Sequence, residues 1–186
     1  MTAFNEKNSM MGRSSGMNDE GTEADGMRTE RLSPRYDAAV ARLIRTNLKA
    51  CRLDIPGTAY FDEGLDHLSV FYDHPDRAYY VLLKEGQVVG GVGYAAFSGF
   101  PNCCEVQKLY LDDCVKGRGF GYALVSFIEE KARERKYQRI YLETHTNLQA
   151  AIHLYEKAGY REIPRPDCVV HSTMNRFYLK ELIAES

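Results

Sequence analysis

The apolar positions of the chain alternate between short strand-like runs and longer helical stretches from about Met27 onward. Runs rich in valine, isoleucine and tyrosine predict strands, because branched and aromatic side chains pack well on a pleated sheet. Such runs are Ala78–Leu83, Val88–Phe97, Glu105–Leu111 and Arg139–Glu143, and further strands are expected over Met27–Leu32, Tyr160–Ile163 and Thr173–Leu182. Glu85-Gly86 joins two of the runs and predicts an antiparallel hairpin.

Apolar residues spaced three or four positions apart predict helices between these runs. Ser33-Pro34 is typical of a helix start, with serine as the N-cap and proline at the first helical position. The longest helix is expected from about Gly119 to Arg135. A last helix is expected to be capped by Asn147 and ended by Gly159. The pattern predicts an α+β fold with a strand–turn–helix–strand unit at its centre.

The first residues of the chain differ in kind from the rest. Met1 to Gly26 consists mainly of methionine, glycine, serine, asparagine and acids, with Phe4 as its single aromatic residue. Such a segment cannot bury enough apolar area to offset the entropy of ordering it. We therefore expect a mobile leader over residues 1–26 and one folded domain over residues 27–186.

Composition and charge narrow the class of protein. The chain has 186 residues, 44% of them hydrophobic, and a formal net charge of -2, which fits a globular domain and gives no general reason to expect nucleic-acid or membrane binding. The sequence shows neither an apolar run long enough for a membrane span nor the layout of a signal peptide. The expected location is the cytoplasm.

Five cysteines are present, and no two of them form a C-x-x-C pair. Zinc sites usually need spaced pairs that close a tetrahedron, so no metal is expected. Cys103, Cys104 and Cys114 lack an adjacent histidine that would activate a thiolate. Covalent catalysis through cysteine is therefore disfavoured.

A glycine-rich turn, Lys116-Gly117-Arg118-Gly119-Phe120-Gly121, stands between a predicted strand and a predicted helix. Glycines let the backbone approach a ligand closely, and the first amides of a helix attract anions. Neither the P-loop pattern nor the Rossmann fingerprint fits these residues. The spacing fits [QR]-x-x-G-x-[GA], with Lys116 in the usual Gln/Arg place. The turn predicts a phosphate or pyrophosphate site; a flexible strand-to-helix connection is the alternative.

The neighbouring motifs extend this interpretation. EVQKLYL from Glu105, KGRGFGYAL from Lys116, YLET from Tyr141 and NLQAAIHLYEKAGY from Asn147 follow one another in order. The last of them matches N-x-x-A-x-x-x-Y-x-x-x-G-[FY] without a gap. In order and separation the run Glu105–Tyr160 resembles the GCN5-related N-acetyltransferase (GNAT) superfamily.

This resemblance implies a mixed, mostly antiparallel sheet of about seven strands flanked by helices, whose fourth and fifth strands splay apart. Acetyl-CoA, a co-substrate, would place its pantetheine arm between those strands. The residues implied as its binding set are Leu109, Tyr110, Leu111, Lys116, Gly117, Arg118, Gly119, Phe120, Gly121, Tyr122, Asn147, Ala150 and Tyr155.

The resemblance also implies roles in catalysis. An amine would attack the thioester directly, with a strand amide near Leu111 stabilising the oxyanion. Tyr155 stands at the family's general-acid position, and its alternative role is core packing. Glu105 stands where the family often places a carboxylate that deprotonates the amine through water; the alternative is an exposed acid at a strand end. Glu143 and His145 are weaker candidates for the base.

The acceptor amine is not specified by the sequence. Candidate walls of its site are Gly57–Glu63, with Asp62, Glu63 and Asp66, and the segment Cys168–Thr173, with His171. The expected activity is N-acetyl transfer to a primary amine of a small molecule or peptide. A non-catalytic acyl-CoA sensor or interaction domain on the same fold is the alternative. Whether the chain forms a homodimer stays open.

Overall fold

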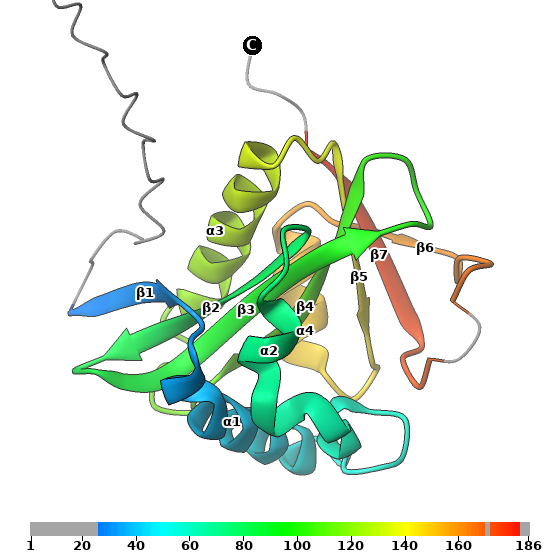
Figure 1. The fold of residues 1–186 in the computed structure, drawn as a ribbon. Helices are drawn as coiled ribbons and strands as arrows, with labels where there is room; N and C mark the ends of the chain where they lie inside the picture. Colours follow the sequence, from blue (N-terminus) through cyan, green and yellow to red (C-terminus); the bar gives the residue numbers. More distant parts are fainter. Residues whose placement is uncertain (1–25, 170–171, 183–186) are drawn as a thin grey trace, which may run out of the picture.

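A seven-stranded sheet runs through the computed structural model, which describes residues 26–169 and 172–182 (Figure 1). The strand order is β1-β2-β3-β4-β5-β7-β6. The strands are β1 (Met27–Arg31), β2 (Arg77–Lys84), β3 (Gln87–Phe97), β4 (Cys103–Leu111), β5 (Arg139–Thr144), β6 (Arg161–Ile163) and β7 (Arg176–Glu181). Among these strands, β4 and β5 form a parallel pair and the other pairs are antiparallel.

Helices cover both faces of the sheet (Figure 1). They are α1 (Asp37–Ala50), α2 (Leu68–Tyr72), α3 (Phe120–Glu134) and α4 (Gln149–Lys157), with 3₁₀ turns at Pro34–Tyr36, Ala59–Phe61 and Glu63–His67. The side chains of α3 and α4 share one buried cluster with one face of the sheet, and those of α1 and α2 share a second with the other face. The expected α+β architecture is confirmed.

The expected strands and helices are found at nearly their predicted positions, with two differences at helix starts. Ser33-Pro34 begins a 3₁₀ turn without a side-chain cap, and α1 itself begins at Asp37. Asn147 does not cap α4: the N-cap is Leu148, and no side chain there bonds the helix amides. The Asn147 side-chain amide instead donates to the Cys51 carbonyl at 3.0 Å, at the end of α1. Gly159 does end the helix, with a φ of 87° that glycine adopts without steric cost.

The splayed strand pair is also confirmed. Pairing of β4 with β5 covers Cys103–Glu105 against Arg139–Tyr141 and then ends. From Val106 onward β4 keeps only its pairing with β3. The backbone of β4 therefore turns an unpaired edge toward β5 in its second half, where a ligand chain can bond it.

A bulge in the same half of β4 changes which face its side chains occupy. The pairing to β3 shifts between Gly93↔Gln107 and Gly91↔Tyr110, and Lys108 adopts a φ of 51°. Before the bulge, Glu105 and Gln107 share the α2 face. After it, Leu109 and Leu111 pack on the α3/α4 face and Tyr110 on the other. The bulge therefore redirects the second half of the strand.

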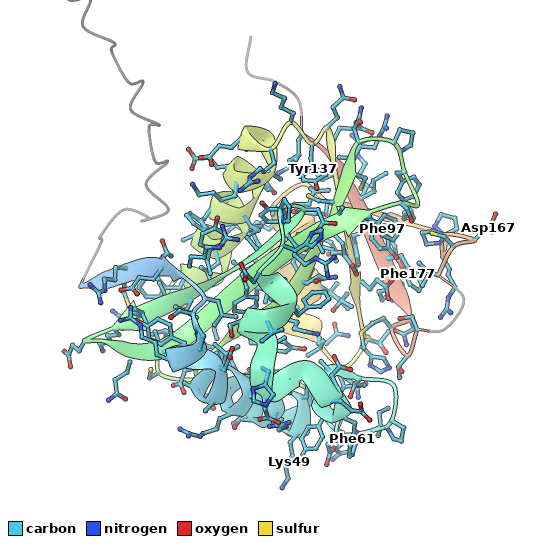
Figure 2. All side chains as sticks on the ribbon, in the orientation of Figure 1. Lys49, Phe61, Phe97, Tyr137, Asp167 and Phe177 are labelled. Carbon is cyan, nitrogen blue, oxygen red and sulfur yellow. The ribbon has the colours of Figure 1, made fainter. Side chains whose placement is uncertain are left out.

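The predicted leader lies outside the described residues except for Gly26, so the domain boundary stays a prediction. Within residues 26–169 and 172–182, no helix combines the length and apolarity that crossing a membrane requires. A third, small cluster closes the β6/β7 side of the sheet, where Phe97 stacks on Tyr141 at a centroid distance of 4.2 Å and Phe177 packs nearby (Figure 2).

Candidate active site

The glycine turn has the backbone that an anion site needs. Gly117 and Gly119 have φ values of 72° and 87°, and a Cβ built on either would meet nothing within 4 Å. The positive φ favours glycine at these two positions, whereas internal packing does not require it. Gly121 differs, since its Cβ would lie 3.2 Å from Leu154 on α4, and so it brings the start of α3 close to α4.

The first turn of α3 presents backbone donors at this turn. Gly119 is the N-cap and carries no capping side chain, and the first helical bond runs from the Ala123 amide to the Gly119 carbonyl at 3.1 Å. The preceding amides, those of Phe120, Gly121 and Tyr122, have no partner within the helix. Together with the positive end of the helix dipole, they suit a phosphate or pyrophosphate.

The two basic side chains of the turn are already engaged. Lys116 Nζ lies 2.6 Å from Asp113 Oδ1, on the loop that precedes the turn. The Arg118 guanidinium lies 5.5 Å from the centre of the Phe120 ring. Both side chains are exposed, so a bound anion would compete with a surface ion pair of modest strength.

The residues implied for the pantetheine arm line the separated strands only in part. Leu109 and Leu111 are half-buried against the α3/α4 cluster. The Leu111 carbonyl already accepts from Asn47 Nδ2 at 3.0 Å, which leaves one lone pair for another donor. Tyr110 packs on the opposite face. Ala150 is exposed at the start of α4.

Tyr155 on α4 is 6% exposed and packs edge-on against Tyr160. Burial raises the pKa of its phenol well above the ordinary value, so it is protonated at neutral pH. Among the described residues, none forms a hydrogen bond with its hydroxyl. Core packing accounts for the buried position of the Tyr155 ring, and its protonated hydroxyl can donate a hydrogen bond to a bound ligand.

Glu105 is half-buried on β4, at the last position that pairs with β5. Its pKa is raised from 4.5 to about 7, first because burial penalises the charge and also because Glu143 adds like charge. The Gln107 amide and Lys108 act in the opposite direction. A carboxyl with a pKa near neutrality can take up a proton and release it under ordinary conditions.

Glu105 and Tyr155 come from opposite faces of the sheet. Tyr155 belongs to the α3/α4 cluster, whereas the partners of Glu105 lead to α2. Gln107, which lies between Glu105 and α2, was not predicted from the sequence. Its Nε2 donates to Glu105 at 2.7 Å, and its Oε1 accepts from the Tyr72 hydroxyl at 2.9 Å. Only the alternation EVQ, which puts residues 105 and 107 on one strand face, could have indicated it.

The two weaker base candidates are held by neighbouring groups. The Glu143 carboxylate accepts from the Tyr141 hydroxyl at 3.1 Å and from the Ser172 hydroxyl. His145 Nδ1 accepts from the Asn147 amide at 3.1 Å. Both interactions order the segment after β5, which is a structural role.

The acidic residues of the first candidate acceptor wall are mostly paired. Asp66 receives both guanidinium nitrogens of Arg45 at 2.7 Å, and Asp62 lies 3.2 Å from Lys108 Nζ. Phe61 is 57% exposed on the same wall (Figure 2). In the second candidate wall, His171 lies outside the described residues.

The cysteines near the site are poorly suited to act as nucleophiles. Burial raises the pKa of Cys103 to about 12 and raises that of Cys104 further. Cys114 is exposed, and its hydrogen bond to Asp112 raises its pKa as well. In the part of the chain that the structure describes, no three His, Cys, Asp or Glu side chains are placed to hold a metal ion.

Comparison with known proteins agrees with the fold. The sequence model of the acetyltransferase (GNAT) family matches residues 44–160. An uncharacterised N-acetyltransferase, YjgM of Escherichia coli K12, is 37% identical over 155 residues, which cover 82% of this chain and 93% of YjgM.

Solved structures share the fold at lower sequence identity. A GNAT-family acetyltransferase of Staphylococcus aureus Mu50 superposes with a TM-score of 0.73 at 19% identity, covering 84% of this chain and 99% of that one. A PaiA N-acetyltransferase of Thermoplasma acidophilum, solved in complex with coenzyme A, has a TM-score of 0.68 at 13% identity, with 83% and 98% covered. The chain therefore belongs to the GNAT family of acetyltransferase enzymes.

Proposed function

We propose that this protein transfers the acetyl group of acetyl-CoA to a primary amine of a small molecule or peptide by direct attack of the amine. The observation that carries the proposal is Glu105, a half-buried carboxyl with a pKa of about 7 at the point where β4 and β5 separate. A base with that pKa can deprotonate an ammonium group near neutral pH.

Acetyl-CoA would supply the activated acyl group as a thioester. The residues fit its binding on two counts. The positive-φ glycines Gly117 and Gly119 leave open space beside the amides at the start of α3, which suits the pyrophosphate. The unpaired edge of β4 over Leu109–Leu111 offers backbone groups to the pantetheine amides, as an added strand would.

Glu105 would accept the proton that the attacking amine must lose, directly or through a water. Tyr155 would donate a proton to the departing sulfur, since its buried phenol stays protonated. Their placement on opposite faces of the sheet suits a reaction in which amine and thiol occupy opposite sides of the acyl carbon. A backbone amide of the β4 segment near Leu111 would stabilise negative charge on the acyl oxygen.

Acetyl transfer can be measured with the full chain, acetyl-CoA and a panel of primary amines. Released coenzyme A should be separated by chromatography, because the exposed thiols of Cys114 and Cys168 would react with a colorimetric thiol reagent. The acetylated amine should be identified by mass spectrometry. We expect coenzyme A and acetylated amine in equal amounts with at least one amine.

Glu105→Gln is the matched variant, since it keeps the shape and removes the base. We expect it to bind acetyl-CoA normally and to lose about 10²-fold or more in kcat/KM near neutral pH. Tight acetyl-CoA binding without product from any amine would instead favour the sensor or interaction domain.

A further inference from the structure

Three side chains on the α2 face of the sheet form a hydrogen-bonded chain that ends at Glu105. The Tyr72 hydroxyl donates to Gln107 Oε1 at 2.9 Å, and Gln107 Nε2 donates to Glu105 Oε2 at 2.7 Å. Tyr72 lies at the end of α2, 35 positions before Gln107 in the sequence. The chain therefore connects a helix of the N-terminal half to the candidate base.

The direction of each bond follows from the donors and acceptors available. An ionised carboxylate only accepts, so the amide nitrogen of Gln107 must face Glu105. The amide oxygen then faces Tyr72, which must donate. Tyr72 can do so at any ordinary pH, because burial raises the pKa of its phenol far above the usual value.

Tyr72 itself has little freedom to move. Its ring is 2% exposed and packs against Tyr79, with centroids 5.3 Å apart, and against Phe71 at 4.8 Å. A fixed hydroxyl fixes the rotation of the Gln107 amide, and that amide in turn fixes one oxygen of Glu105. The other carboxylate oxygen, Oε1, receives no hydrogen bond from a described residue.

We propose that Gln107, held by Tyr72, is the positioning residue that aims the Glu105 carboxylate and favours its charged, proton-accepting form. This rests on the proposed function, in which Glu105 is the base. Gln107 acts through Glu105, and its role does not require contact with acetyl-CoA or the amine.

Among the groups around Glu105, Gln107 contributes most to favouring the charged carboxylate. Glu143 on β5 raises the pKa of Glu105, and Lys108 on the same strand lowers it, while burial is the largest influence. Tyr72, Tyr141, Cys103 and Cys104 also interact electrostatically with Glu105, and all four have strongly raised pKa values and are therefore uncharged. The Gln107 hydrogen bond is the strongest of the influences that favour the carboxylate.

Gln107→Met tests the donor, since methionine has similar length and donates no hydrogen bond. The pKa of Glu105 should rise by about one unit, because a hydrogen bond to the charged form is lost. Tyr72→Phe leaves the amide in place and frees it to rotate, so a smaller rise in the same direction is expected. Gln87→Met is the control, at an exposed position at the start of β3.

The first measurement is a ¹³C NMR titration of the Glu105 side-chain carboxyl in the full chain, assigned by the signal that Glu105→Gln removes. It reads the hydrogen bond without turnover. A rise of the Glu105 pKa in Gln107→Met, a smaller one in Tyr72→Phe and none in Gln87→Met support the proposal. An unchanged pKa in Gln107→Met overturns it.

The second measurement is kcat/KM against pH. The acidic limb of Gln107→Met should move upward with the NMR pKa, giving about a tenfold loss at a pH below the wild-type pKa and recovery at high pH. If Gln107→Met is active and its NMR pKa for Glu105 is shifted, but the acidic limb of its kcat/KM profile is not, the positioning role is overturned. If the wild-type chain acetylates no amine, the proposed function fails, and the titration alone decides whether Gln107 sets the state of Glu105.

Discussion

The hydroxyl of Tyr79 on β2 donates a 2.9 Å hydrogen bond to the carbonyl of Lys108 on β4, across the intervening strand β3. The Tyr79 ring reaches that carbonyl by lying over two glycines of β3. A Cβ on Gly91 would lie 2.5 Å from the hydroxyl oxygen, and one on Gly93 would lie 2.7 Å from the ring. Tyr79 therefore supports the β4 bulge by bonding the carbonyl of Lys108, the residue that adopts the left-handed backbone conformation there.

Gly91→Ala should destabilise the protein, because the fully buried Tyr79 ring has no room to move away from a new methyl group. The expected loss is ~1–3 kcal/mol of unfolding free energy, typical of overpacking. Chemical denaturation measures it. Gly64→Ala is the control, since its Cβ would meet nothing within 4 Å. Equal stability of the two variants would contradict the packing of Tyr79.

Gly119→Ala should weaken coenzyme A binding more than it weakens the fold. Alanine at a φ of 87° costs ~1 kcal/mol in backbone strain, and its methyl group would occupy the open side of the turn. Gly86→Ala at a φ of 79° is the matched control, because it too has open space and lies in the β2–β3 hairpin. Calorimetric titration with coenzyme A should separate them; similar affinities would place the anion site elsewhere.

Tyr155→Phe should lower kcat by about 10²-fold with little change in stability, because no described residue bonds its hydroxyl. Burial keeps the phenol protonated, so its loss removes a proton donor and no charge. Tyr137→Phe, which removes a phenol that donates to the Asp76 carbonyl at 3.5 Å, should leave turnover unchanged. If Tyr155→Phe retained the wild-type kcat, Tyr155 would not be the proton donor, and its role would be core packing alone.

Glu105 should make the stability of the fold depend on pH. Below pH 4.5 its carboxyl is protonated in both folded and unfolded chains, so its contribution to stability is complete there. Between pH 4.5 and about 7 the unfolded chain ionises first, and stability is lost as pH rises. The loss is on the order of 3 kcal/mol.

Glu105→Gln should flatten this pH dependence, since glutamine does not titrate. Denaturant unfolding of both proteins at about pH 5 and about pH 8 measures the difference. The variant should gain stability relative to the wild type at the higher pH. A wild-type protein whose stability rises over this interval as much as the variant's would show that the Glu105 pKa is not raised.

The sequence predicted the elements whose signals are local. Glu85-Gly86 marked the hairpin, and the Gly117 and Gly119 pair marked a turn that does need positive φ. The family motifs predicted the splay of β4 and β5, which no local pattern of β4 shows. Asn147 was misread because its preference for helix caps was outweighed by a long-range bond to the Cys51 carbonyl.

The contacts missed from the sequence join distant segments. Arg45 neutralises Asp66, and Tyr72 reaches Gln107, across 21 and 35 positions respectively. The bulge at Lys108 decides which face each later residue of β4 occupies, and EVQKLYL contains no glycine to announce it. Such pairings depend on tertiary packing, which periodicity does not encode.

Mass spectrometry can follow the transfer of an isotope-labelled acetyl group from acetyl-CoA to a primary amine, with the wild-type chain and with Glu105→Gln, and so show whether Glu105 is the base of an N-acetyl transfer. We expect a labelled N-acetyl product from the wild type, at a rate that rises with pH through about 7 and falls strongly in the variant. Coenzyme A binding without labelled product from any amine, or full activity and an unchanged pH profile in Glu105→Gln, would contradict this expectation.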